Sequence, residues 1–133
     1  MSHYYTGTEK VNHMWRLLQG LKICGNDANI ISHKVRVWCS ACISYMLCDF
    51  ELEIYNECND IYIDIDPNDD IKNNTFIDKA SHRVKTPVIF HKDDNNVCMG
   101  EFSLYEGTII LSSYPFKSGH TYKTSVQVIF ETN

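Results

Sequence analysis

The chain has 133 residues, of which 44% are hydrophobic, 12% aromatic and 22% charged, so it encodes one folded domain and not a disordered or fibrous protein. Its net charge of −5 argues against a protein that neutralises nucleic-acid phosphates, so we expect no nucleic-acid partner. No apolar run reaches the roughly 18 residues that span a bilayer, and the first residues lack the pattern of a signal peptide. We therefore expect no membrane insertion, and synthesis in a cytoplasm.

The first expected element is a helix over residues 8–23 that begins at the N-cap residue Thr8. Its apolar positions repeat at spacings of three and four and form two heptads: Val11, Met14, Leu18 and Leu21. Such a stripe packs either on its own domain or on copies of itself, so these four are candidate oligomerisation residues. A turn at Gly25 ends the helix. The chain then divides into an anchoring or oligomerisation segment, residues 1–25, and a β-sandwich binding domain, residues 26–133.

Beyond residue 26 the hydrophobic period changes from 3.6 to 2, which indicates strands. The expected strands lie at 35–44, 50–54, 61–65, 75–77, 87–90, 97–104, 108–112 and 122–130, with DDNN and EG among the turns. Short strands at intervals of about ten residues predict a mainly β fold, an antiparallel β-sandwich or jelly roll with one N-terminal amphipathic helix.

Two local patterns raise the question of a metal. Cys39-Ser40-Ala41-Cys42 is a CxxC that could bind zinc with Cys48, Cys58 or His33, but within one continuous strand its two thiols would face opposite ways. Asp64–Asp70 resembles the opening of a calcium loop, although Asp69 stands where the loop needs glycine. The metal residues therefore stay unknown, and free, mostly buried thiols are the default for the six cysteines.

Charge and aromatic side chains offer further candidates. Nine acids and no base lie between residues 49 and 70, which is typical of a solvated acidic face.

No spacing singles out a catalytic set, so we expect no enzyme, no catalytic residue and no cofactor. Rings near the last turns can stack on sugars or anchor protein contacts, or else cap the core. The candidate ligand-binding residues are Tyr105, Tyr114, Phe116, His120 and Tyr122.

The order of features over residues 33–130 carries a family resemblance. A strand pair precedes a polar stretch that ends in Arg83 to Pro87, followed by a strand at Val88 to Phe90, by Gly100, and by the turn Glu106-Gly107-Thr108-Ile109. This arrangement resembles the C-terminal β-sandwich of tailed-bacteriophage fibre and receptor-binding proteins. Six cysteines and a short helix in place of a long shaft depart from that pattern.

The resemblance implies a non-enzymatic viral structural protein, a fibre or decoration component. It would form a homotrimer in the virion, associate with other virion proteins, and attach to a glycan or protein of the host surface. Fold analogy alone does not establish function. The alternative is an intracellular protein-interaction domain stabilised by zinc through Cys39 and Cys42. A lipid-binding sandwich, with Phe116, Gly119 and Tyr122 near its end, is a third possibility.

Overall fold

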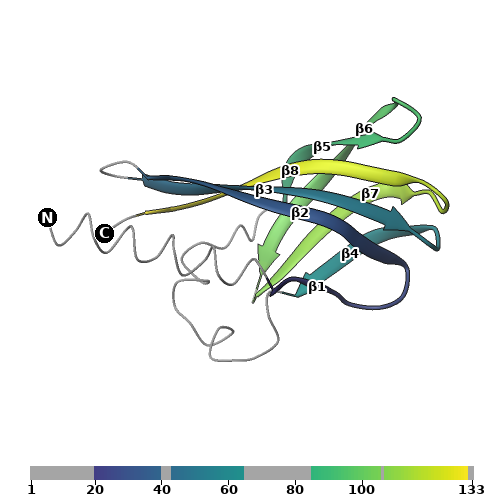
Figure 1. The fold of residues 1–133 in the computed structure, drawn as a ribbon, viewed down its shortest axis with the longest axis horizontal. Coiled ribbons are helices and arrows are strands. Elements are labelled where there is room, and N and C mark those ends of the chain that lie inside the picture. The colour runs from purple at the N-terminus through teal and green to yellow at the C-terminus, as the bar shows by residue number, and fades with distance from the viewer. Residues whose placement is uncertain (1–19, 40–42, 65–84, 106, 132–133) are drawn as a thin grey trace, which may run out of the picture.

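The computed structural model describes residues 20–39, 43–64, 85–105 and 107–131. The strands, which Figure 1 labels, are β1 (Lys22–Ile23), β2 (Ala28–Cys39), β3 (Ile43–Ile54), β4 (Cys58–Asp64), β5 (Thr86–Lys92), β6 (Val97–Tyr105), β7 (Thr108–Phe116) and β8 (Thr121–Glu131). Every pairing between them is antiparallel. The predicted mainly β, antiparallel fold is confirmed.

The strands form one sheet in the order β1-β4-β7-β6-β5-β8-β3-β2. This sheet bends between β5 and β8, which pair only at His91 and Lys92, and so divides into two layers. Figure 1 shows β2, β3 and β8 running together across strands β4 to β7. Pro87 lies in the part of β5 that has separated from β8, where its missing N–H breaks no ladder between these two strands.

The core lies between the two layers and follows the period-2 alternation that the sequence predicts. Inward positions on the strands from β2 to β8 are buried, and they include Ala28, Phe50, Leu52, Ile63, Phe90, Phe102, Leu111, Phe116, Tyr122 and Val126. At one end of this core Phe116 packs edge-on against both Phe90 and Tyr122, with ring centroids 5.1 Å apart in each pair. These rings close the core near the turn that joins β7 to β8.

Two strand predictions needed correction. Lys22 and Ile23, expected at the end of the helix, form β1 and pair with Asp64 and Ile63 of β4. The strand expected over 35–44 is interrupted, because β2 ends at Cys39 and the chain reverses before β3 begins at Ile43. A hairpin between two apolar, alternating segments produces the same sequence pattern as one long strand, which explains the error. The strand predicted at 75–77 and the helix residues 8–19 lie outside the described residues.

Candidate functional site

Four turns meet at one end of the sandwich. Hydrogen bonds link them through the backbone: Ile54 N–H donates to His120 O (3.1 Å), Tyr55 N–H donates to Asp27 O (2.7 Å), and Asp93 N–H donates to Thr121 O (3.0 Å). The turns that join β1 to β2, β3 to β4, β5 to β6 and β7 to β8 are thus held against one another. Side chains far apart in the sequence therefore keep fixed positions here.

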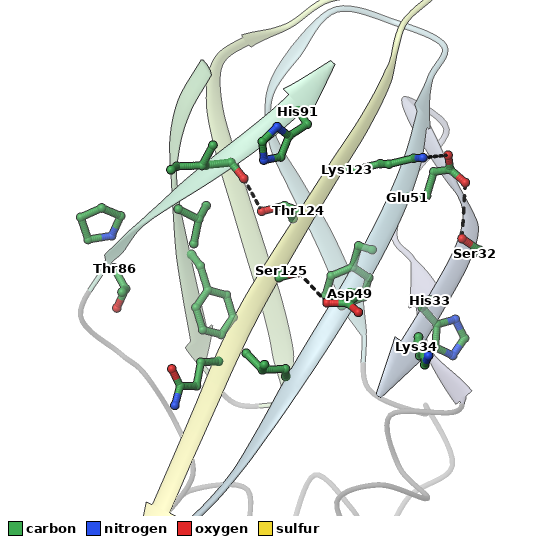
Figure 2. Close-up of a pocket in the computed structure, with 17 residues that line it drawn as sticks. Ser32, His33, Lys34, Asp49, Glu51, Thr86, His91, Lys123, Thr124 and Ser125 are labelled. Atoms are coloured by element: carbon green, nitrogen blue, oxygen red, sulfur yellow. Dashed lines mark hydrogen bonds and ion pairs between the residues drawn. The ribbon is translucent and has the colours of Figure 1, made fainter. Parts of the chain in front are cut away.

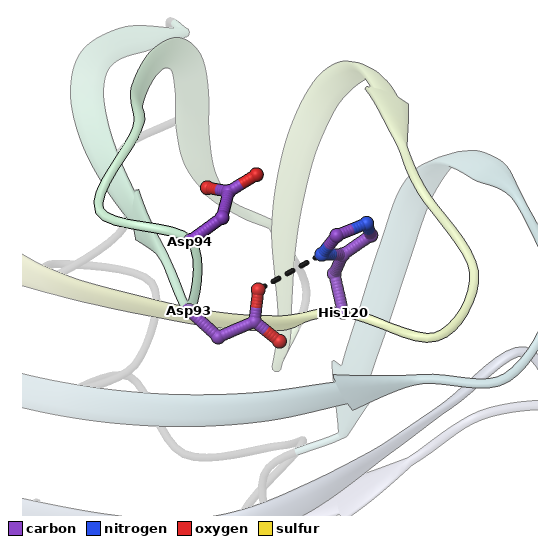
Figure 3. Close-up of side chains that lie close together, drawn as sticks. All are labelled: Asp93, Asp94 and His120. Atoms are coloured by element: carbon purple, nitrogen blue, oxygen red, sulfur yellow. Dashed lines mark hydrogen bonds and ion pairs between the residues drawn. The ribbon is translucent and has the colours of Figure 1, made fainter.

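Asp93, Asp94 and His120, hereafter the Asp93–His120 cluster, lie at this end (Figure 3). His120 Nδ1 is 2.8 Å from Asp93 Oδ1, and Thr121 N–H donates to Asp93 Oδ2 at 3.0 Å. These two hydrogen bonds hold the pKa of Asp93 below its ordinary value. A hydrogen bond from the N–H of Asn96 lowers the pKa of Asp94. Both carboxylates are therefore ionised at neutral pH.

A groove of about 930 Å³ opens where β5 leaves β8 (Figure 2), and we call it the β5–β8 groove. Its lining includes two core rings, Phe50 and Phe102, both almost fully buried. Hydroxyl, carboxylate, imidazole and ammonium groups also line it, among them Thr86, His91, Thr124, Ser125, Asp49, Glu51, Lys123, His33 and Lys34. Thr124 Oγ1 donates to Ile89 O at 2.8 Å and bridges β8 and β5. A concave surface that combines apolar rings with polar groups suits a polar organic ligand such as a sugar.

The outer surface of β2, β3 and β8 carries a ladder of polar contacts. Asp49 forms an ion pair with Arg36 (3.0 Å) and accepts a hydrogen bond from Ser125. Glu51, two residues further along β3, pairs with Lys123 (3.6 Å) from β8. Although burial raises the pKa of Asp49, hydrogen bonds from Ser125 and Arg36 outweigh it and lower that pKa. Acids of the central strand thus face partners on both sides.

The outer surface of the other layer has a different character. Six large apolar or aromatic side chains on it are 44–63% exposed: Tyr62, Ile89, Val97, Met99, Tyr105 and Tyr114. They alternate with buried residues on β4, β5, β6 and β7, so all of them point outward from the same layer. We call this surface the apolar outer face. Ile89 and Met99 are direct cross-strand neighbours, and Tyr114 Oη donates to Glu101 Oε1 at 3.0 Å.

The five aromatic and histidine candidates from the sequence separate into two groups. Tyr105 and Tyr114 are exposed on the apolar outer face, and half-buried His120 belongs to the Asp93–His120 cluster. Phe116 and Tyr122 instead lie in the core, at 0% and 1% exposure, where Tyr122 Oη accepts a hydrogen bond from Lys117 N–H at 2.8 Å. The structure therefore brings Phe116 and Tyr122 together, with no surface open to a ligand, and places Tyr105 and Tyr114 on one outer face and His120 at the four-turn end.

Three of the four predicted oligomerisation residues, Val11, Met14 and Leu18, lie outside the described residues. Leu21 is half-buried and packs against the sandwich core. The division of the chain at residue 25 stays a prediction. Within the described ranges, no helix is long and apolar enough to cross a membrane.

The predicted metal patterns are only partly described. The chain reverses between Cys39 and Ile43, so the CxxC spans a hairpin connection and not the middle of a strand. The side chains of Cys39 and Cys42, and all of the Asp64–Asp70 loop beyond Asp64, lie outside what the structure describes. Cys48, Cys58 and Cys98 are free thiols. Within the described residues, three or more potential metal ligands come together only in the Asp93–His120 cluster, which contains no cysteine.

Sequence reasoning missed Asp93 and Asp94 as site residues because DDNN is typical of a turn and was interpreted only as one. Their partner His120 lies 27 residues further along the chain, in a different turn. The sequence contained only a weak indication of this site. One turn is acidic and another contains histidine, and strands beside these turns could be neighbours in a sheet. Only the pairing of β5 with β8 shows that they are.

Comparison with known proteins does not assign the chain to a family. No protein-family model matches the chain, and no curated protein matches it. Among solved structures it is similar to the bovine atadenovirus type 4 fibre head protein, with 10% identity and a TM-score of 0.48. This likeness spans 81% of the chain and 96% of the fibre head. Similarity at this level is not evidence of a shared function.

Proposed function

We propose that the protein is a non-enzymatic structural component of a virus, in a fibre or decoration, that assembles as a homotrimer and displays its sandwich for attachment to a glycan or protein of the host surface. The resemblance over residues 33–130 implies that this virus is a tailed bacteriophage. In this proposal the protein is made in the host cytoplasm and assembled into the virion with other virion proteins.

The difference between the two outer faces is the observation that carries this proposal. The face of β2, β3 and β8 satisfies its charges internally, through Asp49 with Arg36 and Glu51 with Lys123. The opposite face leaves Ile89, Met99 and other large side chains in water. A contiguous apolar patch on a small domain is typical of a protein–protein interface. We assign this apolar outer face to contacts between copies and the β5–β8 groove to the host ligand.

Charges at the borders of the apolar outer face favour a contact between copies. Asp60 lies on β4 at one border, while Lys85 precedes β5 at the other. When one copy places its β4 border against the β5 border of the next, unlike charges meet. Such a head-to-tail contact forms a closed ring when the rotation from one copy to the next divides a full turn, and a trimer requires a rotation of one third of a turn.

Attachment through the β5–β8 groove is tested by binding to an array of immobilised glycans. We expect the full chain to bind a restricted set of glycans, and His91→Ala and Thr86→Ala, both at exposed groove residues, to weaken that binding. Tyr55→Ala, at an exposed residue that does not line this groove, is the matched control. Binding that persists unchanged in both groove variants would overturn this assignment, and a chain that binds no glycan would shift the proposal to a protein receptor.

The zinc-stabilised interaction domain is the second candidate, and the hairpin reversal at Cys39 favours it. Because β2 ends at Cys39 and pairs antiparallel with β3 from Ile43, the CxxC does not lie within one continuous strand, which removes the objection that its two thiols would face opposite ways. This candidate predicts zinc in the purified protein and unfolding on addition of a chelator. Metal-free protein with an unchanged melting temperature in chelator would exclude it.

A further inference from the structure

The Asp93–His120 cluster combines two carboxylates and an imidazole from two separate turns. Asp93 and Asp94 come from the turn between β5 and β6, and His120 comes from the turn between β7 and β8. We propose that these three side chains bind a divalent transition-metal ion, and that the ion joins the two turns at this end of the sandwich. This site is independent of the proposed attachment function.

The ligand atoms are already gathered. One oxygen of each carboxylate and a ring nitrogen of His120 all lie within 4.8 Å of one another. Metal–ligand distances of about 2.0–2.2 Å require ligand atoms roughly 3–3.5 Å apart, so small side-chain rotations suffice. Asp93 Oδ1 and His120 Nδ1 meet this requirement to within a few tenths of an ångström, at 2.8 Å.

The backbone beneath the cluster is fixed independently of any ion. Asp93 N–H donates to Thr121 O, and Thr121 N–H donates back to Asp93 Oδ2. His120 O in turn accepts the N–H of Ile54. An ion would therefore bind to turns that are already held together, which reduces the ordering that binding would otherwise require.

The charges in the cluster indicate what the ion must replace. Asp94 Oδ2 lies 3.3 Å from the ammonium of Lys92, so a cation already neutralises this carboxylate. Asp93 Oδ1 is hydrogen-bonded to His120 Nδ1, and Asp93 Oδ2 accepts the N–H of Thr121. On binding, the ion takes the place of the hydrogen bond between His120 Nδ1 and Asp93 Oδ1, and Lys92 moves away from Asp94. Glu51, His91 and Lys123 line the hollow beside Asp93 but are not part of the cluster.

Ligand chemistry selects the class of metal. One imidazole nitrogen and two carboxylate oxygens suit Mn²⁺, Co²⁺ and Zn²⁺, with water in the remaining positions. Calcium takes six to eight oxygen ligands and is not well served by a histidine. The side chains of Asp93 and His120 are 42% and 36% exposed, so an ion would be partly hydrated and exchangeable.

Titration of the full chain with Co²⁺, followed by calorimetry and visible absorption, tests the site. We expect one equivalent to bind without the charge-transfer bands of thiolate ligands, which separates this site from the cysteines. His120→Ala and Asp94→Asn should each weaken binding by more than about tenfold. Asp27→Asn, at an exposed carboxylate of the same end of the sandwich but outside the cluster, is the matched control, and Lys92→Met should strengthen binding.

Three results would overturn the proposal: no Co²⁺ binding by the full chain, binding that shows thiolate bands, or binding unchanged in Asp94→Asn. Circular dichroism checks that each variant is folded. Because Asp94 is exposed and contributes no core contact, Asp94→Asn remains informative even if His120→Ala does not fold.

Discussion

The packing around Gly100 requires a glycine at this position. It is buried on β6, and a Cβ atom added there would meet the ring of Phe90 and the carbonyl oxygen of Ser112. The backbone oxygen cannot move away without disturbing the pairing of β6 with β7. The inward side of β6 therefore needs a residue without a side chain at this point.

Replacing Gly100 by alanine should lower the free energy of unfolding by about 3 kcal/mol, the upper range for overpacking a core. Gly119→Ala is the matched comparison, because a methyl group there meets nothing within 4 Å and only its φ of +79° is unfavourable. That variant should lose about 1 kcal/mol. Urea unfolding measures both, and equal losses would contradict the packing explanation.

Cys48 and Cys24 should differ in reactivity. Burial raises the pKa of the Cys48 thiol to about 12, whereas Cys24 is exposed. Since the thiolate is the reactive form, iodoacetamide at pH 8 should modify Cys24 and leave Cys48 intact until the protein unfolds. Peptide mass spectrometry reads out both positions. Rapid modification of Cys48 in the folded protein would be inconsistent with its place in the core.

The raised pKa of Cys48 also has a consequence for stability at high pH. Its folded pKa exceeds the unfolded value, so the protonated thiol favours the folded state fully below the unfolded pKa. This contribution is lost as the pH rises from about 9 toward 12. Cys48→Ala, compared with the parent chain by thermal unfolding, should show a weaker decline in stability over that range. An identical decline in both proteins would assign the effect to other groups.

At the scale of elements, the turn between β7 and β8 is held by Tyr122. The hydroxyl oxygen of Tyr122 accepts the N–H of Lys117, and its ring packs edge-on against Phe116 and Phe90. Tyr122→Phe keeps the ring but leaves this N–H without its partner, and should cost about 1 kcal/mol. Tyr122→Ala should cost about 3–5 kcal/mol because it also removes core volume. If urea unfolding gave the two variants similar stabilities, the ring would not be a core residue.

The contact between the turns after β5 and β7 should depend on pH. The pKa of Asp93 is lowered by hydrogen bonds with His120 and Thr121, so its stabilising effect is present above the unfolded pKa of about 3.9. That effect is lost as the pH falls through the lower, folded pKa. Thermal unfolding should show Asp93→Asn less stable than the parent chain at neutral pH, with the difference shrinking below about pH 4. A constant difference at all pH values would contradict this.

Period-2 alternation predicted strands β4 to β8 well, because each has one buried and one solvent-facing side. It failed at the hairpin after Cys39, where two strands continue one pattern, and at Lys22–Ile23, where a short strand follows a helix-like stripe. The acidic run from Asp49 was expected to face solvent. Glu53, Glu57 and Asp60 are indeed exposed. What the sequence did not predict is that some members also form hydrogen bonds across strands, for example Asp60 with Ser112 and Asp64 with Thr108. Such contacts depend on strand order, which local sequence does not contain.

For the whole molecule, the difference between the two outer faces predicts how copies of the chain associate. The ladder on β2, β3 and β8 is polar and paired, while the apolar outer face exposes residues such as Ile89 and Met99 to water. A single exposed apolar residue is common on a protein surface, but six on one layer form an apolar surface that is typical of a protein–protein contact. The Asp93–His120 cluster lies elsewhere, at the four-turn end, so assembly through the apolar face would leave it accessible. Ile89 belongs to both the apolar outer face and the lining of the β5–β8 groove, so the same assembly would bring a neighbouring copy to the edge of that groove.

The solution mass of the full chain, measured by light scattering during size-exclusion chromatography, tests the central claim of self-association most directly. We expect three times the mass of one chain, and a shift to the monomer mass in Ile89→Glu with Met99→Glu. Lys34→Glu with Gln127→Glu, on the opposite layer, should leave the mass of three chains unchanged. A parent chain that elutes as a monomer at all concentrations, or a trimer unaffected by the Ile89 and Met99 substitutions, would contradict the account.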